Sequence, residues 1–224
     1  MTVDLGGVIN SWLERGSYPN LLGIFLSALL AITLGVVSIS ILWPNAIWRL
    51  NSGPEDLLTS IPGVAIQYYQ VSGSTYEELS GSLRQNAIIA RTGTLHTAKV
   101  DWKINWKFEK DEDGKYDFHN PKLSYEMVVT LPSWSPPPGV DPQLVERWDR
   151  LLKALITHEH GHVNNFIDAY NRISYSVKRV AKRKPNLTLE EANKLASSIL
   201  SQVKIRDRYY DKVTKHGQTQ GVAW

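Results

Sequence analysis

The residues with the clearest chemical potential form one short run, His158-Glu159-His160-Gly161-His162. The run fits the pattern His-Glu-x-x-His, in which the outer histidines lie four residues apart on one helix face. His158 and His162 can therefore both present ring nitrogens to one metal ion. Glu159 is rotated by about 100° around the helix, so it is better placed to reach a water beside that ion. This pattern predicts a Zn²⁺ hydrolase in which Glu159 is the general base.

A catalytic zinc ion needs a third protein ligand and keeps one position open. We expect this ligand near the end of a second, antiparallel helix, because residues at equal distances from the break at Pro185 lie side by side. His216 is the first choice, and Asp211 and then Asp207 are the alternatives. Two further acidic candidates sit at the start of that helix, where a capping role is expected: Glu190 and Glu191.

Three neighbours of this site carry expectations of their own. Tyr210, or else its neighbour Tyr209, is our candidate for donating a hydroxyl to the oxyanion that forms during hydrolysis, with packing between helices as the alternative for either. His160 points away from the ligand pair and is expected either at the surface or in support behind the ligands. Gly161 costs about 1 kcal/mol relative to Ala inside a helix, so a close approach by another segment or the substrate should account for it.

The elements that must position these residues are two long helices. Apolar residues recur with a helical period from about residue 143 until Pro185, and the motif lies within this stripe. Thr188 and Glu191 form a capping box that starts the second helix, which should run to about Thr214.

Strands and one short helix precede the long helices. We expect strands at 64–71, at 98–108, where apolar and polar residues alternate, and at 123–131. Ser74 and Glu77 should cap a helix that runs to about residue 90. The proline-rich stretch 132–142 reads as a loop that no central strand could tolerate. The predicted fold class is α+β, with a small antiparallel sheet and one short helix packed on two long C-terminal helices.

A membrane segment is expected near the start of the chain. Residues 21–43 are almost wholly apolar and long enough to cross the hydrocarbon core of a bilayer. The predicted layout is an N-terminal flank (1–20), a transmembrane anchor (21–43), a linker (44–62) and a zinc metallopeptidase-like domain (63–224). A cleaved signal peptide or a buried core helix are the alternatives, and the flanking charges do not determine the orientation.

Composition excludes several classes of site and partner. The chain has 224 residues and no Cys, which rules out disulfides, Cys-ligated zinc, iron–sulfur sites and a thiol nucleophile. The formal net charge of +3 gives no sign of a dedicated nucleic-acid binder. A basic stretch over 172–184 could meet anionic lipid or polymer, although a solvated helix face is the simpler interpretation.

Several segments resemble one bacterial family of predicted secreted zinc-dependent proteases, filed as domain of unknown function nine hundred and twenty-two. The resemblance covers roughly residues 64–221. It is carried by these stretches: Tyr68 to Thr75, Thr97 to Trp106, Leu131-Pro132-x-Trp134, the His-Glu-x-x-His motif, and Tyr210-Asp211-x-x-Thr214-x-His216-Gly217. It implies a small α+β metallopeptidase outside the cytoplasm, and it favours His216 as a functional residue.

These observations together predict a membrane-anchored zinc metallopeptidase acting on a peptide or protein substrate, with zinc on His158, His162 and His216. A zinc hydrolase of another amide or ester bond, such as a cell-wall bond, is an alternative. A non-catalytic module in which a fourth ligand closes the metal site is another. The motif could also be only a polar turn of helix.

Overall fold

The computed structural model describes residues 54–89 and 95–224. The predicted membrane anchor at 21–43 and the flank before it lie outside these residues. Within the described part of the chain, no helix has the length and apolar character needed to span a membrane. The predicted linker is described only in its second half, where a short helix, α2 (Asp56–Thr59), buries Leu58 completely.

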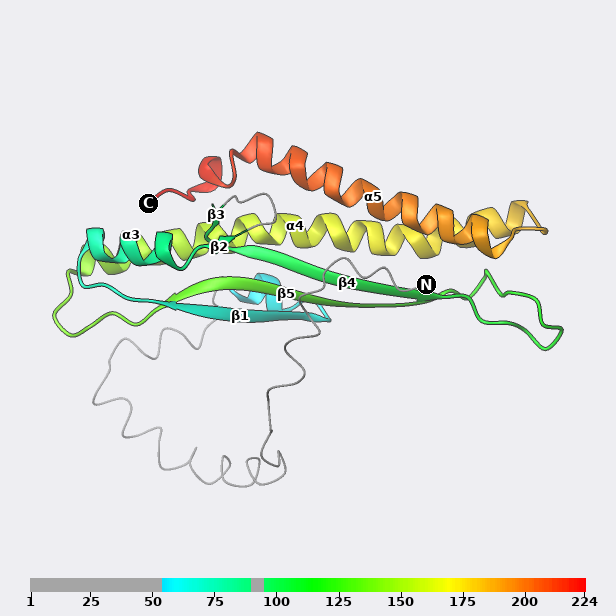
Figure 1. Cartoon of the computed structure of the whole chain (residues 1–224), viewed down its shortest axis with the longest axis horizontal. Helices are drawn as coiled ribbons and strands as arrows, with labels where there is room; N and C mark the ends of the chain where they lie inside the picture. The colour runs from blue at the N-terminus through cyan, green and yellow to red at the C-terminus, as the bar shows by residue number, and fades with distance from the viewer. Residues whose placement is uncertain (1–53, 90–94) are drawn as a thin grey trace, which may run out of the picture. The chain divides into compact units, whose positions relative to one another are not determined.

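Three strands form the main sheet, in the order β1-β5-β4 (Figure 1). They are β1 (Val64–Val71), β4 (Lys99–Lys107) and β5 (Lys122–Trp134). β4 and β5 pair antiparallel, whereas β1 and β5 pair parallel. The sheet is therefore mixed, and the expectation of an antiparallel sheet was wrong for β1. The connection from β1 to β5 passes through α3 and β4, so it is long enough for a parallel crossover.

The predicted end of β5 at Leu131 was also wrong, because the strand continues through Pro132 to Trp134. Pro132 pairs with Tyr69 of β1, while pairing with β4 stops at Thr130. β5 is the central strand of the sheet, but at Pro132 it has a neighbour on one side only. A proline is acceptable in such a position because no strand on the other side requires its missing N–H.

One short helix, α3 (Tyr76–Gln85), follows β1. Its N-cap is Thr75, one residue later than predicted, and Thr75 Oγ1 accepts a hydrogen bond from the Glu78 N–H at 3.2 Å. Ser74–Glu77 and Thr75–Glu78 both fit the capping pattern, so the pattern could not decide between them. The helix ends five residues early, and the small hairpin of β2 (Ile88–Ile89) and β3 (Leu95–His96) follows.

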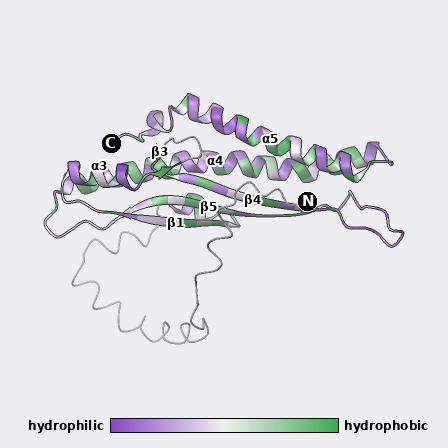
Figure 2. Cartoon of the chain, in the orientation of Figure 1, coloured by the Kyte–Doolittle hydropathy of each residue, from purple (hydrophilic) through white to green (hydrophobic). Residues whose placement is uncertain are grey.

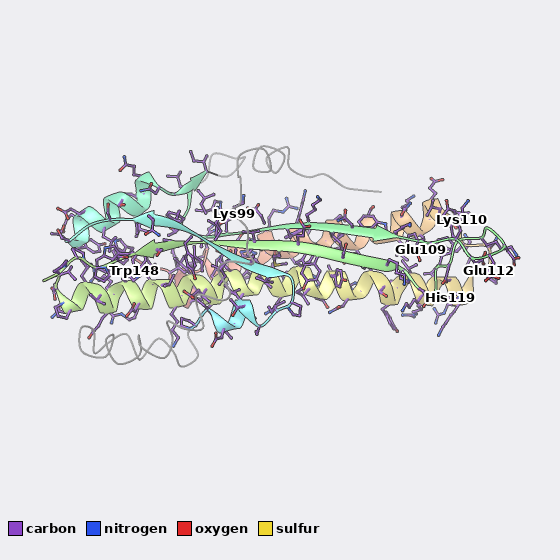
Figure 3. The ribbon with its side chains drawn as sticks, turned by 90° about the horizontal axis from the view of Figure 1, so that it is seen from below. Lys99, Glu109, Lys110, Glu112, His119 and Trp148 are labelled. Carbon is purple, nitrogen blue, oxygen red and sulfur yellow. The ribbon has the colours of Figure 1, made fainter. Side chains whose placement is uncertain are left out.

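Charged residues fill the connection between β4 and β5. Glu109, Lys110, Glu112 and His119 lie at the far end of β4 from Lys99 (Figure 3). Gly114 adopts a φ of +77°, as expected for the glycine of a tight turn. This connection is therefore remote from the start of β4.

Two long helices, α4 (Pro142–Arg183) and α5 (Leu189–Thr214), run antiparallel to each other. α4 packs on β4, β5 and α5. Asp141 caps α4 ahead of a proline in its first turn, and Thr188 and Glu191 form the predicted capping box of α5. Hydrophobic and hydrophilic residues alternate along both helices (Figure 2), as expected for helices with one buried stripe.

The core lies between the sheet and α4. Met127, Val129 and Leu131 alternate along β5 and are almost fully buried, while Phe166 of α4 packs against Trp102 of β4 with ring centroids 4.7 Å apart. This packing holds the middle of α4, and with it the motif, in a set position over the sheet.

Candidate metal centre

Three side chains from α4 and α5 converge on one point. His158 Nε2 lies 3.3 Å from Asp211 Oδ1, and His162 Nε2 lies 3.1 Å from the same oxygen. The two Nε2 atoms are 3.3 Å apart. Four tetrahedral ligands at the usual zinc–ligand distances of about 2.0–2.1 Å would be about 3.3 Å from one another. The three donor atoms thus have the spacing of ligands on a common ion.

The chemistry of this set also suits zinc. Two imidazoles and one carboxylate are common zinc ligands, and the group could hold a metal ion. Within the described residues the group has three members, which is the number that leaves a tetrahedral ion one open position.

A carboxylate behind His162 orients its ring. His162 Nδ1 lies 3.0 Å from Asp207 Oδ1, and Asn165 Nδ2 donates to the same oxygen at 2.9 Å. With the proton on Nδ1, the lone pair of Nε2 points toward the common donor point. Asp207 therefore lies behind the His162 ring and is not one of the three converging donors.

The side-chain amide of Gln220 lies behind His158, as the Asp207 carboxylate lies behind His162. His158 Nδ1 lies 3.0 Å from Gln220 Oε1, and Gln220 Nε2 donates to the Tyr210 hydroxyl at 2.9 Å. Gln220 belongs to η3 (Gln218–Gln220), a single turn that follows α5. No sequence pattern pointed to this residue.

Tyr210 packs against both ligand rings. Its ring stacks on His158 at a centroid distance of 5.1 Å and meets His162 edge-on at the same distance. A Cβ placed on Gly161 would lie 2.2 Å from Tyr210 Cζ. The expected close approach at Gly161 is therefore present, and the approaching segment is α5.

Glu159 lies next to the cluster and is buried, with 4% of its surface exposed. None of the residues that the structure describes hydrogen-bonds its carboxylate. Burial raises the pKa of Glu159 to about 7, and the neighbouring histidines oppose this effect. A carboxylate with a pKa in this range can both take up and release a proton near neutral pH.

The carboxylates of Asp207 and Asp211 stabilise positive charge on the His162 ring. Burial lowers the pKa of His162, but hydrogen bonds with Asp207 and Asp211 outweigh burial and raise the pKa to about 10. Burial raises the pKa of Asp211, and its hydrogen bonds with His158 and His162 reverse this and hold it well below the usual range. A metal cation would satisfy the same electrostatic preference.

The structure places the first-choice third ligand outside the cluster. His216 Nδ1 is 3.9 Å from Asp211 Oδ1, and the His216 side chain is 68% exposed. Asp211, the alternative, takes the third position in the group. His160 is turned outward and hydrogen-bonds Asn164, as expected for a residue off the ligand face.

A further histidine near the cluster was missed by the sequence analysis. His96 of β3 has its pKa lowered mainly by burial, with the Asp211 carboxylate raising it and the His216 and His162 rings lowering it. The charges of the cluster therefore affect the pKa of His96, although 62 residues separate it from His158 in the sequence. The only signal in the sequence was its type, since the chain contains 6 His.

Comparisons with known proteins give one match. Residues 66–217 match the family described as bacterial protein of unknown function (DUF922). No curated protein matches the chain, and no solved structure matches it either. Because the match covers more than half of the sequence, this chain is a member of that bacterial family.

Proposed function

We propose that this protein is a zinc-dependent metallopeptidase that hydrolyses peptide bonds and is anchored to the membrane by residues 21–43, with its catalytic domain outside the cytoplasm. The observation that carries the proposal is the triangle of His158 Nε2, His162 Nε2 and Asp211 Oδ1, with sides of 3.1–3.3 Å. The sequence predicted two corners of this triangle and named the third as an alternative.

The cluster residues divide the work of hydrolysis between them. His158, His162 and Asp211 would hold the ion, and Asp207 and Gln220 would keep the two rings oriented. When bound, zinc supplies a Lewis acid that polarises a carbonyl group and lowers the pKa of water. Glu159 takes the proton from the attacking water and passes it to the leaving amine, so the carboxylate ends in its starting state.

Tyr210 fits a supporting role better than the predicted contact with the oxyanion. Its ring packs on the two ligand rings, and its hydroxyl accepts a hydrogen bond from Gln220. We propose that Tyr210 fixes the ligand rings in place.

One observation favours a second candidate, a metal-stabilised module without catalysis. His216 lies beside Asp211, so a change of its side-chain rotamer could supply a fourth ligand and close the site. The two candidates differ in the effect of removing His216: an open site keeps its metal, and a closed site loses a ligand.

The test uses the purified full-length chain and measures two things, zinc content by mass spectrometry and the cleavage products of a denatured protein. Glu159→Gln should keep one zinc per chain and lose hydrolysis by a factor of at least 10², since the proton acceptor is gone. Asp211→Ala and His162→Ala should lose both zinc and hydrolysis. His216→Ala and the matched control His160→Ala should keep both.

Each alternative has its own outcome. Hydrolysis retained in Glu159→Gln would refute the mechanism. Zinc bound without hydrolysis of protein or peptidoglycan, together with zinc lost in His216→Ala, would favour the closed module. Cleavage of peptidoglycan but not of protein would support the proposed site and replace the proposed substrate.

A further inference from the structure

The chain after α5 makes an unusual turn to return to the motif. Lys215 and His216 both have positive φ values, 51° and 54°, although neither is glycine. Each such residue costs about 1 kcal/mol or more relative to ordinary backbone, so the surrounding structure must stabilise the turn. The turn is closed by backbone hydrogen bonds from His216 N to Asp211 O and from Val222 N to Gly217 O, at 2.8 and 3.0 Å.

This turn brings the backbone against the His158 ring. Gly217 has a φ of +82°, and a Cβ placed on it would be 3.1 Å from His158 Cγ and 2.6 Å from Val222 Cγ2. The next turn, η3, then presents Gln220 to the Nδ1 side of His158. The strained segment therefore delivers one side chain to the side of His158 opposite to the metal group.

Gln220 makes two hydrogen bonds that depend on each other. Its Oε1 accepts from His158 Nδ1 at 3.0 Å, and its Nε2 donates to the Tyr210 hydroxyl at 2.9 Å. A side-chain amide that accepts with its oxygen must donate with its nitrogen, so the orientation of the amide determines both contacts at once. The Nδ1 side of the His158 ring is thereby tied to Gln220, which leaves Nε2 on the side of the metal group, and Tyr210 is held against Gly161.

The neutral amide of Gln220 also limits the negative charge at the cluster. Asp207, Asp211 and Glu159 already place carboxylates at the cluster, and Asp207 orients His162 with a charged acceptor. A neutral acceptor at His158 orients the second ring without adding a fourth negative charge.

We propose that Gln220 is a positioning residue that fixes the orientation of the His158 ring through Nδ1 and the placement of Tyr210, so that the segment after α5 completes the metal site. This inference rests on the proposed function for the identity of the metal. It does not depend on catalysis, because its effects appear in the hydrogen bond at His158 Nδ1 and in metal affinity.

The test compares three variants of the full-length chain by two measurements. The first is the protection of the His158 Nδ1–H proton from exchange with solvent, measured by NMR. The second is zinc affinity from competition with a chelator. Gln220→Met removes both hydrogen bonds at similar size and should weaken zinc binding by about 10–100-fold, with the protection of the Nδ1–H proton lost. Gln220→Glu restores the acceptor, so it should recover the protection and most of the affinity.

Gln218→Met is the matched control, because Gln218 lies in the same turn and is exposed. It should leave the protection and the affinity unchanged. If Gln220→Met keeps both the protection and the affinity of the unmodified protein, the inference is wrong while the proposed function stands. If the unmodified protein binds no zinc but Gln220→Met loses the protection, Gln220 still orients His158, while the proposed metal chemistry and the completion of a metal site fail.

Discussion

The pair formed by α4 and α5 has two regions of opposite character. Toward the turn that joins them, the helices bury small and branched apolar residues: Ala169, Ile173, Val177 and Ala181 on α4, and Ala192, Ala196, Ile199 and Val203 on α5. Toward the other end, the same two helices meet through His158, His162, Asn165, Asp207 and Asp211. We call these the apolar seam and the polar cluster.

The difference between them shows what each region contributes. Apolar contacts have little directional preference, and the burial of these residues in the common core stabilises the packing of both helices. The polar cluster places histidines and aspartates together beside the buried Glu159, which costs desolvation energy that the contacts must offset. Buried polar groups of this kind are frequent at functional sites, and the surrounding apolar core supplies stability that offsets their cost.

An exposed ion pair between the same two helices provides a third case for comparison. Arg206 of α5 pairs with Asp168 of α4, where both side chains are about half exposed. Asp168 lies only a few residues from the cluster, yet solvent screens its interaction. Burial rather than the presence of charge therefore distinguishes the cluster from the surface between the helices.

Breaking the seam should have the largest effect on stability. Ile199→Ala removes a buried side chain and leaves a cavity, so the free energy of unfolding should fall by about 2–5 kcal/mol. Zinc stoichiometry should stay unchanged in the folded protein, because no cluster residue is altered. Urea denaturation and metal analysis check the two parts, and a loss of zinc without a loss of stability would contradict the division of roles.

Removing a side chain that orients one of the proposed ligands should affect metal binding more than stability. Asp207→Ala removes the acceptor that orients His162, and zinc affinity should fall by about 10–100-fold, equivalent to about 1.4–2.7 kcal/mol. Asp168→Ala is the matched control on the neighbouring surface, with an expected stability change of at most about 1 kcal/mol and no change in affinity. Chelator competition measures both variants, and equal affinities would show that the Asp207 contact has no role in holding the site.

The contact between the helices at Gly161 should give a smaller effect. A Cβ at Gly161 would lie 2.2 Å from the Tyr210 ring, so Gly161→Ala must displace Tyr210. Overpacking of this kind costs about 1–3 kcal/mol, and the better helix propensity of Ala offsets about 1 kcal/mol of it.

Gly81→Ala provides the control for that substitution. Gly81 also lies within a helix, and a Cβ there would meet no atom within 4 Å. This variant should gain up to about 1 kcal/mol from helix propensity alone. Thermal unfolding of both variants separates crowding from propensity, and a stabilised Gly161→Ala would mean that Tyr210 moves aside at no cost.

Local patterns predicted most of the secondary structure. The alternation at 98–108 and the capping box at Thr188 and Glu191 led to elements that the structure confirms within one residue. These signals work because hydrophobic period and capping depend on neighbours along the chain. The strand through Pro132 and the parallel β1–β5 pair were missed because each depends on which strand lies alongside.

Within the candidate site, the sequence by itself determined that two histidines share one face of a helix. His158 and His162 lie four residues apart on α4, so helical geometry alone brings their nitrogens together, and Glu159 must lie beside them. The antiparallel arrangement about Pro185 also narrowed the third ligand to a short list that contained Asp211.

Only the tertiary structure shows which members of that list lie beside the two histidines. The rotation of α5 about its own axis turns Asp207 and Asp211 toward α4, and the backbone turn at Lys215 and His216 leaves His216 exposed and brings Gln220 to His158. The close approach of Tyr210 to Gly161 accompanies this rotation, and the hydrogen bonds from His216 N to Asp211 O and from Val222 N to Gly217 O close the turn. The approach of Tyr210 to Gly161 joins residues distant in the chain, and spacing along one helix carries no information about it.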